Sequence, residues 1–393
     1  MPLRKQSTAN PVRIAVLVDT STGYSTQLIR GVARYVRERG QPWQLLVQPR
    51  GENERSLMPR HWQADGVIAR VTHRVLARDL QRRRIPVVNV SVSTVAGFEF
   101  PQVTVDERLV GQLAAQHLLE QGFRSFGYFG NWTQANYADR CGPAFAEAVL
   151  DRGFPCRFFR PLRPGTTNHQ PPAVRALQRW LRELPKPVGL LATDANDAHL
   201  IREHCRAAAL RVPDEVAIVS GEDDELLCAI SQPALTCVDL GSERVGIEAA
   251  AVLERLMAGR RPSAKLILIP PLRIIARQST DTLAIDDPLL ARAVRYIRTH
   301  AGHPIQVRDV LREVPLSRRA LEQRFRTVLG RSPGAEIRLV HVARARELLM
   351  TTDLLISQIA RTSGFNYAEV MNEVFRRELQ QTPTDVRRVA KLR

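Results

Sequence analysis

The chain has 393 residues, of which 44% are hydrophobic, and a formal net charge of +17 at pH 7, so it is long enough for two or three domains with hydrophobic cores. No apolar run approaches the roughly 18 residues that span a bilayer, and the polar first ten residues lack the apolar stretch of a secretory signal. The five cysteines include no CxxC pair, which indicates reduced thiols in a cytoplasm and argues against structural zinc.

Residues 11 to about 279 alternate short β-branched runs with amphipathic helical stretches. The expected strands are 13–18, 44–47, 66–69, 86–90, 126–129, 188–192 and 216–220. The expected helices are 25–39, 107–121, 143–152, 172–184 and 196–208. This alternation is typical of doubly wound parallel α/β sheets, and the length suits two such lobes. Ligands of these folds bind beyond the carboxyl ends of the strands.

The same region carries short motifs whose order and spacing run through strands, helices and turns. They are Val103-Thr104-Val105-Asp106, Gly111, Ala114, His117-Leu118, Gly122, Phe145, Ala148, Gly153, Thr193-Asp194, Val212-Pro213, 216–219, Asp223 and Pro233-Ala234-Leu235-Thr236. On these residues, the segment 11–275 resembles the LacI/periplasmic sugar-binding superfamily. The resemblance implies a two-lobed sensor over residues 1–280 that holds a small sugar between its lobes, with a pentose such as xylose favoured. Regulators of that superfamily usually have a DNA-binding head before the first strand, where only about ten residues stand here.

Three carboxylates are candidates for binding sugar hydroxyls, because two of them follow the expected strands 188–192 and 216–220 and the third follows the strand of the motif Val103-Thr104-Val105. The resemblance implies this role for Asp106, Asp194 and Asp223. The alternative for Asp106 and Asp194 is a helix N-cap. Asp223 stands in the acidic run GEDDE and is alternatively a solvated loop residue.

Three further side chains are candidates for the same sugar site. Arg140 stands one position before the place where the family has a clamping arginine, which is Cys141 here, so it is either a shifted clamp or a surface residue. Trp132 and Tyr24 lie on expected loops, where an aromatic ring can stack on a sugar or simply pack. Tyr24 falls in the loop after the first strand, which favours a position facing the ligand.

Residues 281–288, with the sequence DTLAIDDP, are expected to form a short acidic linker, and Asp287-Pro288 is a typical helix start. Residues 288–393 then hold 20 basic and 10 acidic side chains, a net +10 of the total of +17. Such concentration is typical of a surface that faces phosphate. Only four of the 57 basic residues are Lys, however, so the arginine bias inflates the pI and basicity alone is weak evidence.

The C-terminal region contains one helix-turn-helix pattern twice, fifty residues apart. Val310, Val314, Leu321, Phe325, Ser332 and Pro333 recur as Ala360, Gly364, Met371, Phe375, Thr382 and Pro383. A small or β-branched residue, a tight turn four residues later, and apolar residues seven and eleven beyond the turn are what two packed helices require. The pattern predicts motifs at about 307–327 and 356–378 within an all-α domain spanning 289–393.

Further residues of this region keep a recognisable order. They are Ala345-Arg346-Glu347-Leu348-Leu349, Ile356-Ser357-Gln358-Ile359-Ala360, Ser363-Gly364-Phe365, Thr382-Pro383 and Arg387. On these residues the segment resembles the DNA-binding domain of the AraC/XylS family of bacterial transcription regulators. The resemblance implies double-stranded promoter or operator DNA and RNA polymerase as partners. His341, Met371 and Gln380 depart from the family, in which Arg, Phe and Gly are usual at these places.

The second helix of the first motif is expected over 317–327, with Ser317 as its N-cap. Its exposed stripe consists of Arg319, Glu322, Gln323 and Arg326. We expect Arg319 and Gln323 to read base edges, since these side chains pair with guanine and adenine, respectively. Arg318 and Arg326 are expected to contact phosphate.

The second helix of the second motif is expected over 367–378. Its exposed stripe consists of Glu369, Asn372, Glu373 and Arg376. Carboxylates beside DNA are unfavourable unless they accept a hydrogen bond from cytosine. We therefore expect Asn372 and Glu369 to specify bases, with Arg376 and Arg377 holding the backbone.

These features predict a cytoplasmic transcription regulator of a sugar catabolic operon, associated with the nucleoid when bound to DNA. The alternative is a sugar-binding protein, or an architectural DNA-binding protein whose sensor has lost its response. No phosphate-binding, hydrolase or zinc-protease motif is present in the sequence, so neither an enzyme nor a cofactor or metal is expected. LacI-type sensors commonly self-associate, which implies a homodimer formed by residues 11–280.

Overall fold

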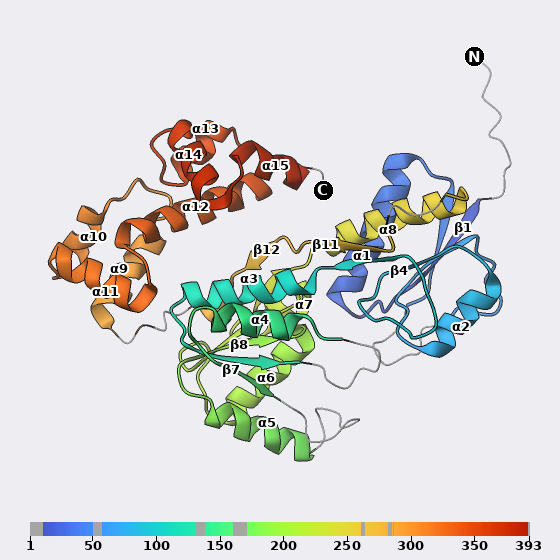
Figure 1. Ribbon diagram of the computed structural model, residues 1–393, viewed down its shortest axis with the longest axis horizontal. Coiled ribbons are helices and arrows are strands. Elements are labelled where there is room, and N and C mark those ends of the chain that lie inside the picture. The colour runs from blue at the N-terminus through green and yellow to red at the C-terminus, as the bar shows by residue number, and fades with distance from the viewer. Residues whose placement is uncertain are drawn as a thin grey trace. The chain divides into compact units, whose positions relative to one another are not determined.

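The computed structural model describes residues 11–49, 57–130, 138–159, 171–260, 264–281, 285 and 287–391. The chain forms two compact units, Met1–Leu119 with Arg124–Thr282, and Glu120–Phe123 with Leu283–Arg393. Part of the expected linker 281–288 lies outside the described residues. The first unit contains two α/β lobes, and the second is built of helices (Figure 1). The predicted fold class is confirmed.

The first lobe is built on a six-stranded parallel sheet in the order β11-β5-β4-β3-β1-β2 among the described residues. Its strands are β1 (Val12–Leu17), β2 (Trp43–Val47), β3 (Gly66–Ala69), β4 (Val87–Asn89), β5 (Gln102–Val105) and β11 (Leu266–Ile269). Its helices are α1 (Gly23–Arg39), α2 (Arg74–Arg83) and α8 (Ser242–Met257). The strand β3 is buried at every residue, as expected where helices cover both faces of a parallel sheet.

The second lobe repeats this architecture with the strand order β12-β10-β9-β8-β6-β7, in which β12 alone among the described strands is antiparallel. Its strands are β6 (Ser125–Phe129), β7 (Cys156–Phe159), β8 (Val188–Ala192), β9 (Val216–Ser220), β10 (Thr236–Asp239) and β12 (Arg273–Ile275). Its helices are α3 (Glu107–Glu120), α4 (Cys141–Leu150), α5 (Pro171–Glu183), α6 (Ala195–Ala207), α7 (Glu225–Ile230) and the 3₁₀ turn η1 (Gln278–Thr280). The predicted strands and helices of both lobes therefore form, with ends shifted by one or two residues.

Both lobes arrange their first five strands in the order 2-1-3-4-5. The direction of winding reverses between β1 and β3 in one lobe and between β6 and β8 in the other. Ligands of such sheets bind beyond the carboxyl ends of the strands at this reversal. The chain passes between the lobes after β5, after β10 and between β11 and β12. These crossings are short, so they suit a hinge.

Close packing of α1 on α8 depends on two glycines inside the first lobe. A Cβ atom on Gly31 would lie 2.0 Å from the carbonyl oxygen of Glu243, and one on Gly246 would lie 2.1 Å from that of Leu28. Real Cβ contacts do not occur at these distances. Glycine at both positions therefore lets the two helix backbones touch, at some loss of helix propensity.

The second unit consists of seven described helices around two separate cores. They are α9 (Pro288–Thr299), α10 (Val307–Glu313), α11 (Arg318–Leu329), α12 (Pro333–Thr351), α13 (Ile356–Thr362), α14 (Ala368–Leu379) and α15 (Pro383–Lys391). Leu321 and Phe325 are buried in the first core, and Met371 and Phe375 in the second. The helix α12 contributes side chains to both cores, so it joins the two motifs, as the fifty-residue repeat predicts.

The two turns of the repeat differ in backbone conformation. Gly364 adopts a left-handed conformation with φ +77°, as predicted, whereas Val314 in the first motif remains extended with φ −124°. A Cβ atom on Gly364 would also lie 2.4 Å from Nε2 of the buried His341, which packs edge-on against Phe365. The second motif therefore closes tightly on α12 at a histidine where the family usually has an arginine.

Replacement of Gln380 by glycine is expected to stabilise the second unit by up to about 1 kcal/mol. Gln380 ends α14 with φ 54°, in the left-handed region, and Gly330 ends α11 fifty residues earlier with φ 67°. Denaturant unfolding of Gln380→Gly should show the increase. The reciprocal Gly330→Gln should lose stability, and an unchanged midpoint for both variants would contradict the argument.

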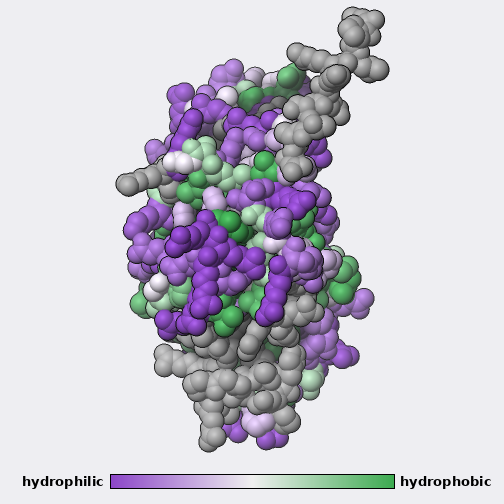
Figure 2. Space-filling view, turned by 90° about the vertical axis from the view of Figure 1, so that its right-hand side faces the viewer, coloured by the Kyte–Doolittle hydropathy of each residue, from purple (hydrophilic) through white to green (hydrophobic). Residues whose placement is uncertain are grey.

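Hydrophilic residues cover most of the described surface on the face shown in Figure 2, with smaller hydrophobic areas between them. Within the described part of the chain, no helix is both long and apolar enough to cross a membrane.

Candidate effector site and DNA-binding surface

A cavity of about 130 Å³ lies between the two lobes, at the carboxyl ends of their strands. The first lobe lines it with residues of α1, β5 and the segments after β3 and β4, and the second lobe with residues of α3, α4 and the segments after β8, β9 and β10. The lining residues are Tyr24, Arg70, Val90, Ser91, Val92, Ser93, Thr104, Val105, Glu107, Val110, Cys141, Thr193, Asp194, Gly221, Glu222 and Leu240. A cavity of roughly 150 Å³ holds a benzene ring, so this one suits a small cyclic molecule.

Tyr24 and Arg70 flank the winding reversal of the first lobe. The Tyr24 hydroxyl donates a hydrogen bond to the Val90 carbonyl at 2.9 Å, and burial raises the pKa of Tyr24 to about 12. The Arg70 guanidinium lies over the Tyr24 ring, 5.6 Å from its centroid. Nε of Arg70 is buried and has no hydrogen-bond partner among the described residues. Because Arg70 lines the cavity, a ligand oxygen that accepts a hydrogen bond from its guanidinium would be stabilising.

Asp194 and Glu222 bring two carboxylates into the cavity from the second lobe. Asp194 caps α6 by accepting from the Asp197 backbone N–H at 2.8 Å, and burial raises its pKa. Burial and then the negative charge of Asp194 raise the pKa of Glu222 to about 7. The positive charge of Arg70 acts in the opposite direction and lowers the pKa of both carboxyl groups. The cavity therefore combines acceptors and a cationic donor, as recognition of a polyhydroxylated molecule requires.

The lobes also touch directly at the N-terminus of α1. The Gly23 N–H donates to Oδ2 of Asp224 at 3.0 Å, and the Tyr24 N–H donates to Oε1 of Glu222 at 2.9 Å. Unpaired N–H groups at a helix start attract negative charge, so these two bonds favour the closed arrangement. A Cβ atom on Gly23 would lie 2.4 Å from the Asp223 carbonyl oxygen, which shows how closely the backbones approach.

Of the sequence-predicted ligand residues, Tyr24 and Asp194 line the cavity, and three others do not. Oδ1 of Asp106 accepts from the Arg108 and Leu109 backbone N–H groups at 3.1 and 3.5 Å, at the start of α3. Arg140 is exposed next to α4. Asp223 turns toward Cys237, which donates to its Oδ1 at 3.0 Å. Trp132 lies outside the described residues.

In each of those three cases the neighbouring residue lines the cavity instead, namely Glu107, Cys141 and Glu222. Sequence reasoning also missed Arg70. Its signal was its place directly after the expected strand 66–69, at a carboxyl end where ligands bind.

The first recognition helix, α11, has the predicted N-cap and buried face. The Ser317 hydroxyl accepts from the Ala320 N–H at 3.2 Å. Arg319, Gln323 and Arg326 are exposed on the opposite side. Glu322 is half-buried and accepts from Nε of Arg318 at 3.1 Å, so the two side chains pair with each other.

The second recognition helix, α14, exposes the predicted charged residues, and two large hydrophobic side chains, one of them on the N-cap residue, are exposed near its start. Glu369, Glu373, Arg376 and Arg377 are exposed. Asn372 is half-buried, and its Oδ1 is buried with no partner among the described residues. Tyr367 and Val370 are 68% and 44% exposed, which sequence reasoning missed because it placed only polar residues on this side.

Three protein-family matches cover most of the chain. Residues 13–106 match the XylR N-terminal domain, residues 115–280 the periplasmic binding protein-like domain, and residues 310–389 a helix-turn-helix domain. Together with the cavity between the lobes and the paired motifs, they define a DNA-binding transcription regulator with a periplasmic-binding-protein-like sensor and an AraC-type C-terminal domain. Both resemblances predicted from the sequence are confirmed.

Relatives that match nearly the whole chain identify the family more specifically. The xylose operon regulatory protein of Escherichia coli K12 is 30% identical over 96% of this chain and 97% of its own length, and that of Haemophilus influenzae is 29% identical over 95% and 98%. A solved structure of a xylose-binding transcription activator is 28% identical, with a TM-score of 0.60 over 96% of this chain and 98% of that one. The chain belongs to the family of xylose operon regulatory proteins.

A more distant structure supports the sensor fold alone. A LacI family transcriptional regulator from Mycobacterium smegmatis is 19% identical, with a TM-score of 0.53 over 68% of this chain and 98% of that one. Because the curated relatives are transcription regulators, the family is not one of enzymes.

Proposed function

We propose that the chain is a xylose-responsive regulator of a sugar catabolic operon, with xylose held in the cavity between the two lobes. The observation that carries this proposal is a cavity at the strand ends that is lined by Arg70 and by the two acidic residues Asp194 and Glu222. The names of the full-length relatives support xylose as the effector.

The residues of the cavity suit a pentose in a six-membered ring form. Each sugar hydroxyl can donate one hydrogen bond and accept others. Asp194 and Glu222 accept from hydroxyls, and Arg70 donates to a hydroxyl or ring oxygen. The Tyr24 ring, held by its own bond to Val90, supplies an apolar face for the C–H groups of the sugar. Ligand contacts from both lobes would favour closure, because only the closed state makes all of them.

Titration of the full chain with sugars tests the effector. At a concentration of 100 times Kd, a bound sugar stabilises the folded sensor by about 2.7 kcal/mol. Thermal unfolding is compared in D-xylose, D-ribose, L-arabinose and D-glucose. We expect D-xylose to produce this stabilisation at the lowest sugar concentration. Stabilisation by a hexose alone, or by none of the four sugars, would contradict the proposal.

We further propose that α11 and α14 read DNA in the major groove. On α11, Arg319 and Gln323 contact base edges, while Arg326 and the paired Arg318 contact phosphate. On α14, Asn372 and Glu369 specify bases, and Arg376 and Arg377 hold the backbone. The exposed side chains Tyr367 and Val370 add apolar contact with thymine methyl groups.

Arg319→Ala is expected to cost roughly 1–3 kcal/mol of binding free energy at one base-pair position. The guanidinium is exposed on α11 and pairs with guanine in the major groove. Binding to a library of operator variants measures this position by position. Equal weakening on every sequence, as expected for the control variant Arg326→Ala, would make Arg319 a phosphate contact.

The proposed assembly is a homodimer formed by the sensor. We place this homodimer in the cytoplasm, associated with the nucleoid when it is bound to DNA. At the promoter it contacts RNA polymerase. One chain already carries two different recognition helices, so its two half-sites lie about 34 Å apart along DNA and need not be palindromic. Light scattering of the full chain with and without D-xylose, followed by footprinting, tests this arrangement. A monomer that protects about two helical turns would contradict it.

A further inference from the structure

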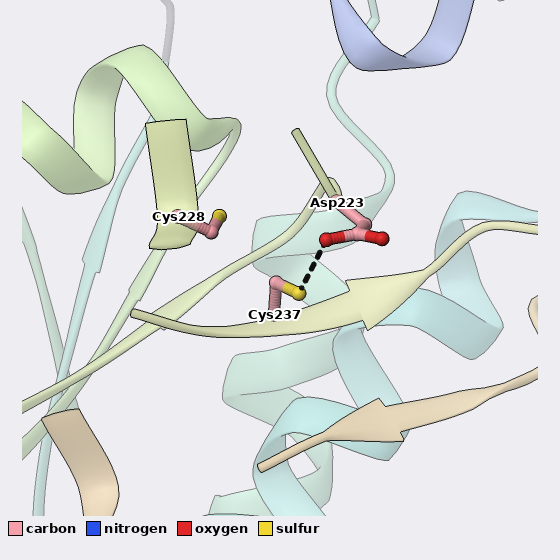
Figure 3. A group of neighbouring side chains, drawn as sticks. All are labelled: Asp223, Cys228 and Cys237. Atoms are coloured by element: carbon pink, nitrogen blue, oxygen red, sulfur yellow. Dashed lines mark hydrogen bonds between the residues drawn. The ribbon is translucent and has the colours of Figure 1, made fainter. Parts of the chain in front are cut away.

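Three side chains of the second lobe gather two thiols and a carboxylate outside the effector cavity. Asp223 follows β9, Cys228 lies on α7, and Cys237 lies on β10 (Figure 3). Their ligating atoms all lie within 4.8 Å of one another. The Cys237 thiol donates to Oδ1 of Asp223 at 3.0 Å. Both cysteines are fully buried, whereas the Asp223 side chain is 24% exposed.

Arg277 provides a positive charge beside this group. Its Nη1 donates to Sγ of Cys237 at 2.8 Å, and its Nη2 donates to Oδ1 of Asp223 at 3.4 Å. The guanidinium therefore contacts both a thiol and the carboxylate of the group.

We propose that Asp223, Cys228 and Cys237 bind one thiophilic divalent cation of the Zn²⁺ type. Zinc–sulfur and zinc–oxygen distances of about 2.3 and 2.1 Å place two sulfurs and one oxygen of a tetrahedral site roughly 3.6–3.8 Å apart. The three ligating atoms need only small movements to reach this spacing. Three protein ligands leave a fourth position for water. The partly exposed Asp223 marks the side from which the ion enters.

Charge balance favours such an ion in this buried place. Without metal, the two thiols are neutral, and the charges of Asp223 and Arg277 cancel. A divalent cation forms two metal–sulfur bonds and releases the two thiol protons to water, so the total charge stays unchanged. Arg277 then serves as an outer donor to a metal-bound sulfur and carboxylate, as second ligand shells commonly do.

The site also connects to the effector cavity through the chain. Asp223 lies between Glu222, which lines the cavity, and Asp224, which accepts from the Gly23 N–H across the lobes. A metal bound to Asp223 therefore fixes the segment that closes the lobes. If the cavity binds a sugar as proposed above, we expect the metal to raise sugar affinity. This second effect rests on the proposed function, whereas metal binding itself does not.

Titration of the reduced full chain with Co²⁺ and Zn²⁺ tests the site directly. Cobalt bound to thiolates shows charge-transfer absorption, which should saturate at one equivalent and disappear on addition of Zn²⁺. Cys228→Ser and Cys237→Ser should abolish the absorption, and Asp223→Asn should weaken binding at least tenfold. Cys205→Ser is the matched control, because Cys205 is equally buried in the core of the same lobe but lies outside the group.

Cooperative thermal unfolding and an unchanged far-UV spectrum show that the sensor of each variant is folded. Absence of thiolate absorption in the parent chain would overturn the proposal, as would absorption that survives in both serine variants. A disulfide between Cys228 and Cys237 formed on mild oxidation, without metal binding to the reduced chain, would identify a redox pair and also overturn it. Metal binding without any sugar response would leave the site in place and contradict only the proposed function.

Discussion

Arg70→Ala should weaken sugar binding by about 10- to 150-fold, equivalent to the 1.5–3 kcal/mol of a lost charge-assisted hydrogen bond. The Arg70 guanidinium is held over the Tyr24 ring, and Arg70 lines the cavity. Its charge also moderates the repulsion between Asp194 and Glu222. Without it, a sugar would lose a donor and meet two uncompensated carboxylates. Isothermal titration of the full chain with the effector sugar measures the loss.

Arg74→Ala is a suitable control, because Arg74 lies four residues later on α2 and is exposed. It should leave both sugar affinity and stability within experimental error. Ligand-free DNA binding should be unchanged in both variants, since neither residue belongs to the C-terminal unit. Equal affinity of Arg70→Ala and the parent chain for the sugar would remove Arg70 from the site.

Sequence reasoning located the strand ends that form the cavity, but three of the ligand residues that it predicted do not line it. It selected Asp106, Arg140 and Asp223, whereas the adjacent Glu107, Cys141 and Glu222 line the cavity. Side chains of consecutive residues point in different directions, so a shift of one residue changes what a side chain faces. The backbone turn after a strand decides this direction. The spacing of the sequence motifs does not predict the conformation of that turn.

The fold itself was largely predictable where burial leaves a clear pattern. The fully buried β3, β8 and β9 appear in the sequence as continuous apolar runs. The edge strand β11 was missed although its sequence LILI is a continuous apolar run, and in the structure its residues alternate between exposed and half-buried. Helix α8 was missed too, although it packs closely on α1. Its partner lies some two hundred residues away, and local periodicity does not show such long-range contacts.

In the C-terminal unit, the fifty-residue repeat predicted more than the helices. Both buried pairs and the N-cap Ser317 occur where expected. The offset extends to the helix ends, where Gly330 corresponds to Gln380 and both adopt left-handed backbone. The turn of the first motif differs, because Val314 lacks the freedom of Gly364 and stays extended. The sequence repeat predicts which positions of the two motifs are structurally equivalent. The type of residue at each position then determines the local backbone conformation.

Gly23→Ala should weaken sugar binding roughly 5- to 150-fold while leaving the ligand-free sensor as stable as before. The added Cβ atom would lie 2.4 Å from the Asp223 carbonyl oxygen and 2.7 Å from Cα of Asp224, across the lobes. Such overpacking destabilises a structure by about 1–3 kcal/mol. The binding free energy of the ligand must offset this amount when the lobes close. Within α1, alanine is the better helix former. The penalty therefore falls on the closed state alone, and calorimetric titration combined with thermal unfolding separates the two effects.

Gly31→Ala provides the contrast, since Gly31 lies on the same helix but packs within one lobe. Its Cβ atom would lie 2.0 Å from the Glu243 carbonyl oxygen of α8, so the lobe itself must distort. This variant should unfold at lower temperature with or without sugar. Gly23→Ala should unfold at the parent temperature without sugar and gain less from sugar than the parent does. Equal losses of ligand-free stability in the two variants would mean that the contact at Gly23 maintains the fold and does not control closure.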